Sequence, residues 1–236
     1  MSRLRSRMLM MEPVAASASP LLTDLISYWK LDEASGNAVD AHGTNTLTDN
    51  NTVTSAAGII GTARQFTRTN TESLSISSNA SLQTGPISYT FAGWVYWDST
   101  ANTQGIVAKD GGGGREYVLQ MELDAQISLY VFGSPGVYKS VTVLKPTATA
   151  WHFFACGVNL DTNTINIQID NGTVTSTSLA GFTVGAAGTA DFAIGNASGS
   201  TFDGRIDELG FWKRVLTSDE LTQLYNAGAG LAYPFS

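Results

Sequence analysis

The chain of 236 residues has little cysteine, and this bounds how it can be stabilised. Cys156 is the one cysteine, so no disulfide can form within the chain. It lies in the apolar run "WHFFACGV" and is expected to be a buried core thiol. A chain of this length can bury enough apolar surface to fold without a disulfide or a metal. The low cysteine content fits both cytosolic proteins and many surface proteins.

Positive charge is also scarce. The 13 Lys and Arg residues face 20 Asp and Glu residues, which gives a formal net charge of −7. Nucleic-acid binding depends on a clustered basic face, so no nucleic-acid partner is expected. No apolar run approaches the roughly 18 residues of a membrane-spanning helix, and no membrane span is expected either.

Most catalytic signatures are missing as well. The sequence contains no G-x-S-x-G elbow, P-loop, H-E-x-x-H pair or paired Cys/His metal motif. The only histidines are His42, in a polar loop, and His152, next to Trp151 in an apolar segment. The glycines at 111–114 are not followed by Lys-Ser/Thr, so they predict a hairpin loop and not a phosphate-binding loop.

What the sequence does have is a series of short strand patterns from residue 23 onward. They are rich in β-branched and aromatic residues and are separated by turn signals such as "DGGGG" and "GSPG". The predicted strands are 88–98, 116–123, 127–132, 152–160, 164–170 and 191–196. Strands at this spacing with no helices between them indicate a sandwich or jelly roll.

One helix is predicted near the end of the chain, in "LTSDELTQLYNAG". Thr217 and Glu220 have the spacing of a capping box. Leu221, Leu224 and Tyr225 form an apolar stripe at helical spacing, and Gly228 suits the C-terminal stop. The helix is expected to pack on the end of the sandwich.

Several of these segments, in this order, resemble a known family. The segments are "LISYWKLDEASGNAVDAHGTNTLT", "GIIGTARQF", "YTFAGWVYW", "WHFFACGVNLDTNTINIQIDNG" and "FDGRIDELGFWKRVLTSDELTQLY". They resemble laminin-G-like modules of the concanavalin A-like lectin/glucanase superfamily, over about residues 23–228. The resemblance implies an all-β antiparallel jelly roll of two sheets, with the first and last strands side by side. It leaves function open, because this fold carries lectins, adhesins, glycosidases and virion proteins.

Two acidic pairs are candidates for glycoside hydrolysis. Asp207 and Glu208 are adjacent on a predicted strand, where alternation would point them to opposite faces and prevent paired action. Glu122 and Asp124 resemble the alternating glucanase pattern, but the third acidic position is Gln126. The periodicity places Asp124, with Gln126, in a hairpin turn. No catalytic residues are therefore assigned, and an enzyme is not expected.

Calcium is the metal that the sequence could bind, although the fold should not require it. Related modules often bind calcium, and hard cations prefer carboxylate and carbonyl oxygens. The candidate ligands are Asp32, Asp40, Asn45 and Asp207, with Glu33 nearby. The alternative is that Asp207 accepts hydrogen bonds from backbone amides where the terminal strands meet.

Sugar binding would use aromatic faces and planar polar groups on an exposed surface. The candidate ligand-binding residues are Tyr96, Trp97, Arg115, Tyr117, Tyr130 and Tyr138. Four other tryptophans, Trp29, Trp94, Trp151 and Trp212, lie in the family-like segments and are expected in the core. Alternation sends Trp94 and Trp97 to opposite faces, so at most one of them should be fully interior.

The N-terminal segment differs in composition from the rest. Residues 1–22 are expected to be an extended arm, and residues 23–236 the jelly-roll domain. The arm resembles a secretory signal, but "MLMM" is short and Glu12-Pro13 interrupts it. Arg3, Arg5 and Arg7 are therefore predicted to anchor the protein to a partner.

Two functions remain open. The first is a non-catalytic module on a virion surface, such as a capsid decoration or fibre protein, present in many copies or as a homo-oligomer and able to bind glycans. The second is a secreted or cell-surface module for carbohydrate binding or adhesion, whose first 18 residues would be removed. The first is favoured because of the basic arm.

Overall fold

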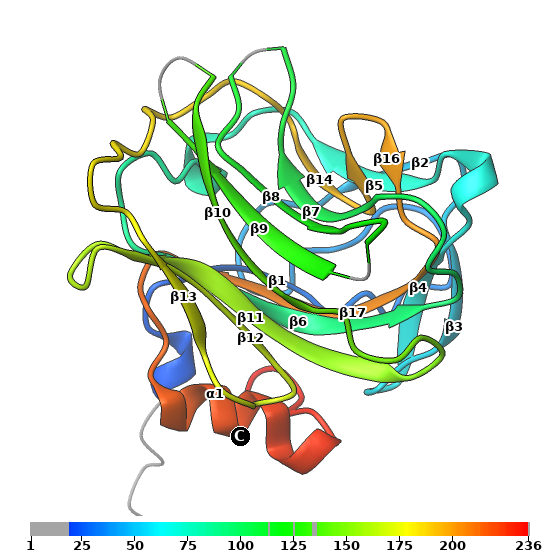
Figure 1. Cartoon of the computed structure of the whole chain (residues 1–236). Coiled ribbons are helices and arrows are strands. Elements are labelled where there is room, and N and C mark those ends of the chain that lie inside the picture. Colours follow the sequence, from blue (N-terminus) through cyan, green and yellow to red (C-terminus); the bar gives the residue numbers. More distant parts are fainter. Residues whose placement is uncertain (1–18, 113, 125, 134–135, 236) are drawn as a thin grey trace, which may run out of the picture.

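The protein is a sandwich of two antiparallel sheets with one helix beneath it. The computed structural model describes residues 19–112, 114–124, 126–133 and 136–235. The two sheets are stacked face to face, and the helix lies on the outer side of one of them (Figure 1). This confirms the predicted all-β jelly roll with one short C-terminal helix.

The sheet next to the helix, here called the back sheet, has eight strands. Seven follow the order β13-β12-β11-β6-β17-β4-β3, and β1 pairs with β17. Their bounds are β1 (Leu25–Trp29), β3 (Thr54–Ala57), β4 (Thr62–Phe66), β6 (Tyr89–Trp97), β11 (Trp151–Asn159), β12 (Thr164–Ile169), β13 (Thr175–Ser178) and β17 (Gly204–Trp212). Tyr28 pairs with Gly210, which confirms that the first and last strands lie side by side.

The other sheet, here called the front sheet, has seven strands in the order β10-β9-β8-β7-β14-β5-β2. Their bounds are β2 (Thr48–Asn50), β5 (Ser73–Ile76), β7 (Gln104–Lys109), β8 (Tyr117–Met121), β9 (Gln126–Phe132), β10 (Tyr138–Leu144) and β14 (Phe192–Ile194). A two-stranded ribbon, β15 (Asn196–Ala197) and β16 (Ser200–Thr201), lies against β7. Short 3-10 turns are η1 (Pro20–Leu22), η2 (Arg68–Asn70), η3 (Ala80–Leu82) and η4 (Asn226–Gly228).

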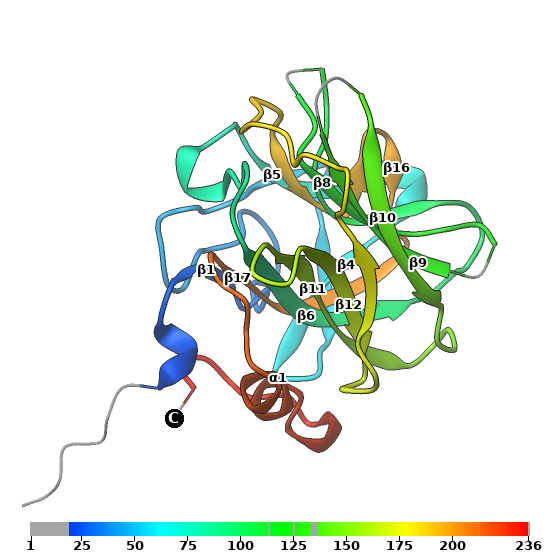
Figure 2. The same ribbon diagram turned by 60° about the vertical axis from the view of Figure 1, so that its left-hand side comes forward.

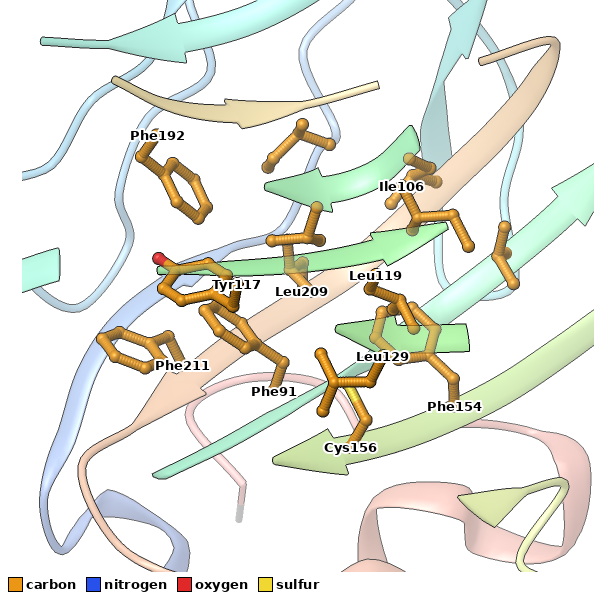
Figure 3. Packing of buried hydrophobic residues seen from close by; sticks show 14 of the residues in the cluster. Phe91, Ile106, Tyr117, Leu119, Leu129, Phe154, Cys156, Phe192, Leu209 and Phe211 are labelled. Carbon is orange, nitrogen blue, oxygen red and sulfur yellow. The ribbon is translucent and has the colours of Figure 1, made fainter. Parts of the chain in front are cut away.

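The main core fills the space between the two sheets. Alternation along β9 sends Ile127, Leu129 and Val131 inward, where they are buried. Aromatic rings from the two sheets meet there: the ring centroids of Phe91, on β6, and Tyr117, on β8, are 5.0 Å apart (Figure 3). Cys156 is buried in this core, as predicted.

Helix α1 (Ser218–Tyr225) begins at the predicted capping box. The Thr217 side chain accepts from the Glu220 amide, and the Glu220 side chain accepts from the Thr217 amide. The predicted stop at Gly228 is wrong, because Asn226 takes the left-handed conformation that ends the helix. Asn tolerates this conformation better than other residues with a side chain, so it can replace glycine here.

A second core lies on the outer side of the back sheet, which we call the covered face. It consists of side chains from β1, β6, β11, β17, α1, η1 and the C-terminus, namely Leu21, Leu25, Tyr28, Ala92, Trp94, Phe153, Ala155, Trp212, Leu216, Leu221, Leu224 and Phe235. Trp97 points into the main core and Trp94 into this second core. Both are buried, which corrects the expectation that at most one would be interior.

The folded domain begins earlier than residue 23. Leu21 is fully buried, and its carbonyl accepts a hydrogen bond of 2.7 Å from the Trp212 indole nitrogen. Arg214 donates to the Pro20 carbonyl at 3.0 Å. The 3-10 turn η1, which contains Pro20 and Leu21, lies beside the C-terminal residues on the covered face (Figure 2). Residues 20–22 therefore belong to the domain and not to the arm.

Candidate functional site

The adjacent carboxylates Asp207 and Glu208 point to the same side of β17, contrary to the alternation prediction. The pairing of β17 with β6 shifts between Asp207 and Gly210, and Glu208 has a φ of 49°. This bulge brings Ile206 and Leu209 both into the main core. The two acids between them face the covered side, where Glu208 lines a small cavity beside Tyr28.

Burial sets the chemistry of this acidic pair. Asp207 is fully buried and Glu208 is 4% exposed. Burial raises the pKa of Asp207 to about 8, against hydrogen bonds from the Ile59 and Ile60 amides that lower it. Burial also raises the pKa of Glu208 to about 7, opposed by its hydrogen bond from the Tyr28 hydroxyl. The pair is closed to a saccharide, so it cannot act on one.

The predicted calcium ligands are not gathered in one place. Both oxygens of Asp40 accept backbone amides, from Tyr28, His42 and Gly43 on one oxygen and from Asn45 on the other. The Asn45 side chain donates to Ser27 Oγ and accepts from Asn79 and Ser81.

The other two predicted ligands lie at a different loop, residues 58–62. Asp207 accepts from the Ile59 and Ile60 amides, and Asp32 accepts from the Thr62 amide at 3.0 Å. The amide-binding alternative for Asp207 is thus the observed one. Across the described residues, no three His, Cys, Asp or Glu side chains are grouped to hold a metal ion.

The outer side of the front sheet, here called the open face, carries two neighbouring hollows. The first has a volume of about 320 Å³ and is lined mainly by hydroxyl, amide and carboxylate groups. Its residues are Asn50, Ser73, Ser75, Ala108, Asp110, Asp191, Ala193, Asn196, Ser198 and Gly199. We call it the polar hollow.

The second hollow has a volume of about 220 Å³ and is lined by aromatic and planar polar groups. Its residues are Arg115, Val118, Gln120, Tyr130, Phe132 and Tyr138. We call it the aromatic hollow. The Tyr130 and Tyr138 ring centroids are 5.2 Å apart in an edge-to-face contact, and Tyr138 is 56% exposed.

Arg115 and Asp110 join the two hollows. The Arg115 guanidinium makes two hydrogen bonds to Asp110, from Nε and, at 3.0 Å, from Nη2. Its Cζ atom also lies 4.0 Å from the centroid of the Phe132 ring. Two bonds and one stacking contact hold the guanidinium in one orientation.

Three of the six predicted ligand-binding residues meet on the open face: Arg115, Tyr130 and Tyr138. Trp97 and Tyr117 point into the main core, so the prediction that they contact a ligand is wrong. Tyr96 lies on the back sheet, with the Arg205 guanidinium 4.5 Å from its ring centroid and the Trp151 ring beside it. It is therefore separate from the other three.

Sequence reasoning missed the polar hollow altogether. Its polar residues are Ser, Asn and Asp positions from segments that lie far apart in the sequence, and the order of the strands in the sheet brings these segments together. Phe132 and Gln120 were also missed, although alternation in "ISLYVF" and "YVLQM" would have placed them on the same face as Tyr130.

The remaining acidic candidate, Glu122, borders the aromatic hollow. Its Oε1 atom accepts from Gln120 at 2.9 Å and from the Tyr130 hydroxyl at 2.8 Å. Asp124 lies in the turn between β8 and β9, as predicted, while Gln126 begins β9. The anchoring candidates Arg3, Arg5 and Arg7 lie outside the described residues.

The comparisons with known proteins agree with this architecture. Residues 68–222 match the family model described as the concanavalin A-like lectin/glucanases superfamily. The chain belongs to this superfamily. The fold is that of lectin-like carbohydrate-binding domains, as the sequence resemblance predicted. No curated protein sequence matches the chain.

Solved structures of low sequence identity share the fold. Domain 4 of AbnA, a GH43 extracellular arabinanase from Geobacillus stearothermophilus, in complex with arabinotriose, has a TM-score of 0.65 and 20% identity, over 84% of this chain and 97% of that one. The binding domain of Paraclostridial Mosquitocidal Protein 1 has a TM-score of 0.72 and 12% identity, over 88% of this chain and 53% of that one. A binding domain of Botulinum Neurotoxin DC in complex with SialylT has a TM-score of 0.69 and 9% identity, over 88% and 52%.

This chain spans about half the length of the toxin binding domains it matches. The neighbours are mostly binding domains, and their likeness establishes the fold of this chain.

Within the part of the chain that the structure describes, no helix is long and apolar enough to cross a membrane.

Proposed function

We propose that this protein is a non-catalytic recognition module that binds carbohydrate on its open face. The observation that carries the proposal is the aromatic hollow, where exposed Tyr138 and half-buried Tyr130 lie beside Arg115 and Gln120. Sugar rings pack on aromatic faces, while planar polar groups bind their hydroxyls. The polar hollow next to it adds further hydroxyl, amide and carboxylate groups.

The neighbours support this choice of ligand. The arabinanase domain is described in complex with arabinotriose, and the neurotoxin domain in complex with SialylT. Both belong to other proteins, so they make a glycan ligand reasonable here and do not identify it.

A binding experiment with matched variants tests the proposal. The full chain is titrated with an array of oligosaccharides, and the best binders are repeated with Tyr138→Ala and with Tyr96→Ala. We expect Tyr138→Ala to lower the affinity about tenfold or more, as for an anchor residue. Tyr96→Ala removes a comparable ring from the back sheet and should leave the affinity unchanged. Binding that is lost in Tyr96→Ala, or insensitive to Tyr138→Ala, would contradict the proposal.

The absence of catalysis is part of the same proposal. Asp207 and Glu208 are closed to a saccharide, and Glu122 is tied to Gln120 and Tyr130. Paired carboxylates of glycosidases flank the scissile bond at about 5 to 10 Å from each other across the sugar. We expect no release of reducing sugar from any bound oligosaccharide. Hydrolysis that disappears in Glu122→Gln would overturn this.

We further propose that the module is displayed on a protein assembly, such as a virion capsid or fibre, in many copies. The support is the basic composition of the segment before residue 19 and the firm attachment of Pro20 and Leu21 to the domain. A triple variant, Arg3→Ala, Arg5→Ala and Arg7→Ala, should lose association with the native particle and keep its saccharide affinity. If association is unchanged, or if the mature chain begins near Ser19, the secreted alternative takes its place.

A further inference from the structure

The charges of the open face restrict the class of saccharide that fits it. Two carboxylates, Asp110 and Asp191, and one guanidinium, Arg115, line the two hollows. Glu122 stands at the border through its bonds to Gln120 and Tyr130. With these groups ionised, this part of the surface is net negative, like the chain as a whole, which has a formal charge of −7.

The one guanidinium lining the hollows is already engaged. Two of the Arg115 nitrogens are bonded to Asp110, and its planar face lies on Phe132. A carboxylate or sulfate on a ligand would have to compete with Asp110 for this cation. Two lysines near these strands, Lys109 and Lys139, do not supply another cation to the hollows. Lys109 is fully buried and bonded to Glu116 and to the Gly188 and Ala190 carbonyls.

The second lysine, Lys139, pairs with Val131 on β9, a residue whose side chain lies in the main core. Alternation therefore directs Lys139 away from the side on which Tyr138 lies. An anionic saccharide would meet Asp110, Asp191 and Glu122 with no uncommitted cation among the described lining residues. Hydroxyl groups, in contrast, can donate to the exposed carboxylate of Asp191.

The shape of the face favours a ligand longer than one sugar. Ala108 lines the polar hollow and Val118 lines the aromatic hollow, and the two residues pair directly across β7 and β8. Both side chains are buried in one small apolar cluster with Phe132 and Ala197, which lies beneath the two hollows as a common floor. From Ser75 on β5 to Tyr138 on β10 the path crosses five strand spacings, or about 24 Å at ~4.8 Å each.

We infer that the open face binds an uncharged oligosaccharide laid across the strands, with one sugar ring on Tyr138 and the following rings over the polar hollow. This inference rests on the proposed function and adds to it the ligand class and direction. Asp110 and Arg115 then form the fixed point between the two ends of the ligand. Asp191 accepts hydrogen bonds from the ligand's hydroxyl groups, and Asn196 and the serines can either accept from them or donate to them.

Titration calorimetry with matched probes tests the inference on the full chain. The first pair is xylopentaose and the same pentasaccharide carrying one glucuronic acid; the second is an unsubstituted and a sulfated galactan oligosaccharide. In whichever pair binds, we expect the uncharged saccharide to bind at least about tenfold more tightly than its charged counterpart at low salt. The difference in affinity should become smaller as salt screens the repulsion between the charged saccharide and the acidic residues. A pentasaccharide should bind more tightly than the monosaccharide of the same sugar.

Variants of one exposed acid sharpen the test. Asp191→Asn keeps an oxygen that can accept from the Ser78 amide, which Asp191 Oδ1 does at 3.2 Å, and removes the charge. Asp191→Lys reverses the charge. The ratio of the charged-probe affinity to the uncharged-probe affinity should rise from the parent to Asp191→Asn and again to Asp191→Lys, by about threefold or more in all.

The outcomes separate this inference from the proposed function. Binding that depends on Tyr138 but prefers the charged probe, or is equal for mono- and pentasaccharide, overturns the inference and leaves the proposed function standing. If no oligosaccharide binds, or if binding is unaffected by Tyr138→Ala, the proposed function and this inference are both contradicted.

Discussion

The two outer faces of this sandwich differ in whether other elements of the fold cover them. The covered face of the back sheet is closed by α1, η1 and the C-terminal residues, which turn it into a second apolar core. The open face of the front sheet carries an exposed Tyr138 and two hollows lined by polar and aromatic side chains. Of the two outer faces, the first adds a buried apolar core to the stability of the fold, whereas the second leaves a large aromatic residue exposed.

The comparison also explains why acidic residues differ in meaning between the faces. On the covered face, Asp207 and Glu208 are buried, and burial raises the pKa of each. On the open face, Asp191 is exposed and can accept from sugar hydroxyls. Acidic residues therefore weaken the fold at high pH on the covered face, whereas on the open face the proposed function has one of them contact the ligand.

The largest expected effect compares one aromatic residue from each face. Trp212→Ala removes a fully buried ring and its bond to the Leu21 carbonyl, so the free energy of unfolding should fall by about 3 to 5 kcal/mol. Tyr138→Ala removes a ring that is more than half exposed and should cost less than about 1 kcal/mol. Urea unfolding curves measure both. An equal loss of unfolding free energy in the two variants would contradict the claim that the covered face contributes more to stability than the open face.

The next effect is the pH dependence of stability on the covered face. The folded-state pKa values of Asp207 and Glu208 lie above their ordinary values, so their protonated forms favour the fold. Their contribution is fully present below about pH 4 and is lost as the pH rises through about 7 and 8. Asp207→Asn keeps an acceptor for the Ile59 and Ile60 amides without the charge.

Unfolding at several pH values checks this linkage. The stability of Asp207→Asn relative to the parent should rise between pH 5 and 8, by at most about 1.4 kcal/mol per pH unit. Asp191→Asn, on the open face, is the matched control and should show no such rise. A relative stability of Asp207→Asn that is flat or falls over this range would contradict the buried state of the pair.

A smaller effect is expected at the cap of the helix that closes the covered face. Thr217→Ala removes the acceptor for the Glu220 amide, and the free energy of unfolding should fall by about 1 kcal/mol. Saccharide affinity should stay the same, because α1 and the open face lie on opposite sides of the molecule (Figure 1). A loss of affinity larger than about twofold would show that the two faces are coupled.

The smallest effect concerns calcium. The oxygens of Asp40 and Oδ2 of Asp207 already accept backbone amides, and these residues lie away from the two hollows. We therefore expect that a chelator changes saccharide affinity by less than about twofold. A loss of binding on chelation, restored by calcium, would place a metal ion in the recognition site.

Much of the fold could be predicted because its signals are local. Alternation of apolar residues marks the strands, and the Thr217–Glu220 spacing marks the helix start. The bulge at Glu208 could not be predicted in this way. It puts a non-glycine residue in the left-handed conformation, where burial against Tyr28 and pairing with distant strands hold it.

The site was predicted only in part, for a related reason. Composition identifies aromatic residues such as Tyr117 and Tyr130 equally well, but the order of strands decides which side of a sheet lies outside. Tyr117 points into the main core and Tyr130 to the open face from neighbouring strands. The polar hollow depends on β2, β5, β7 and β14 lying together, which no local pattern of the sequence states.

The most direct test is to map where an unsubstituted oligosaccharide binds. Amide chemical shifts of the isotope-labelled full chain are followed during titration with the tightest uncharged pentasaccharide. The account predicts that the shifts change along one path across the open face, at Tyr138, Tyr130, Ser75 and Asn196. Changes centred on Tyr96 and Trp151 of the back sheet, or on residues around Trp212, would contradict it.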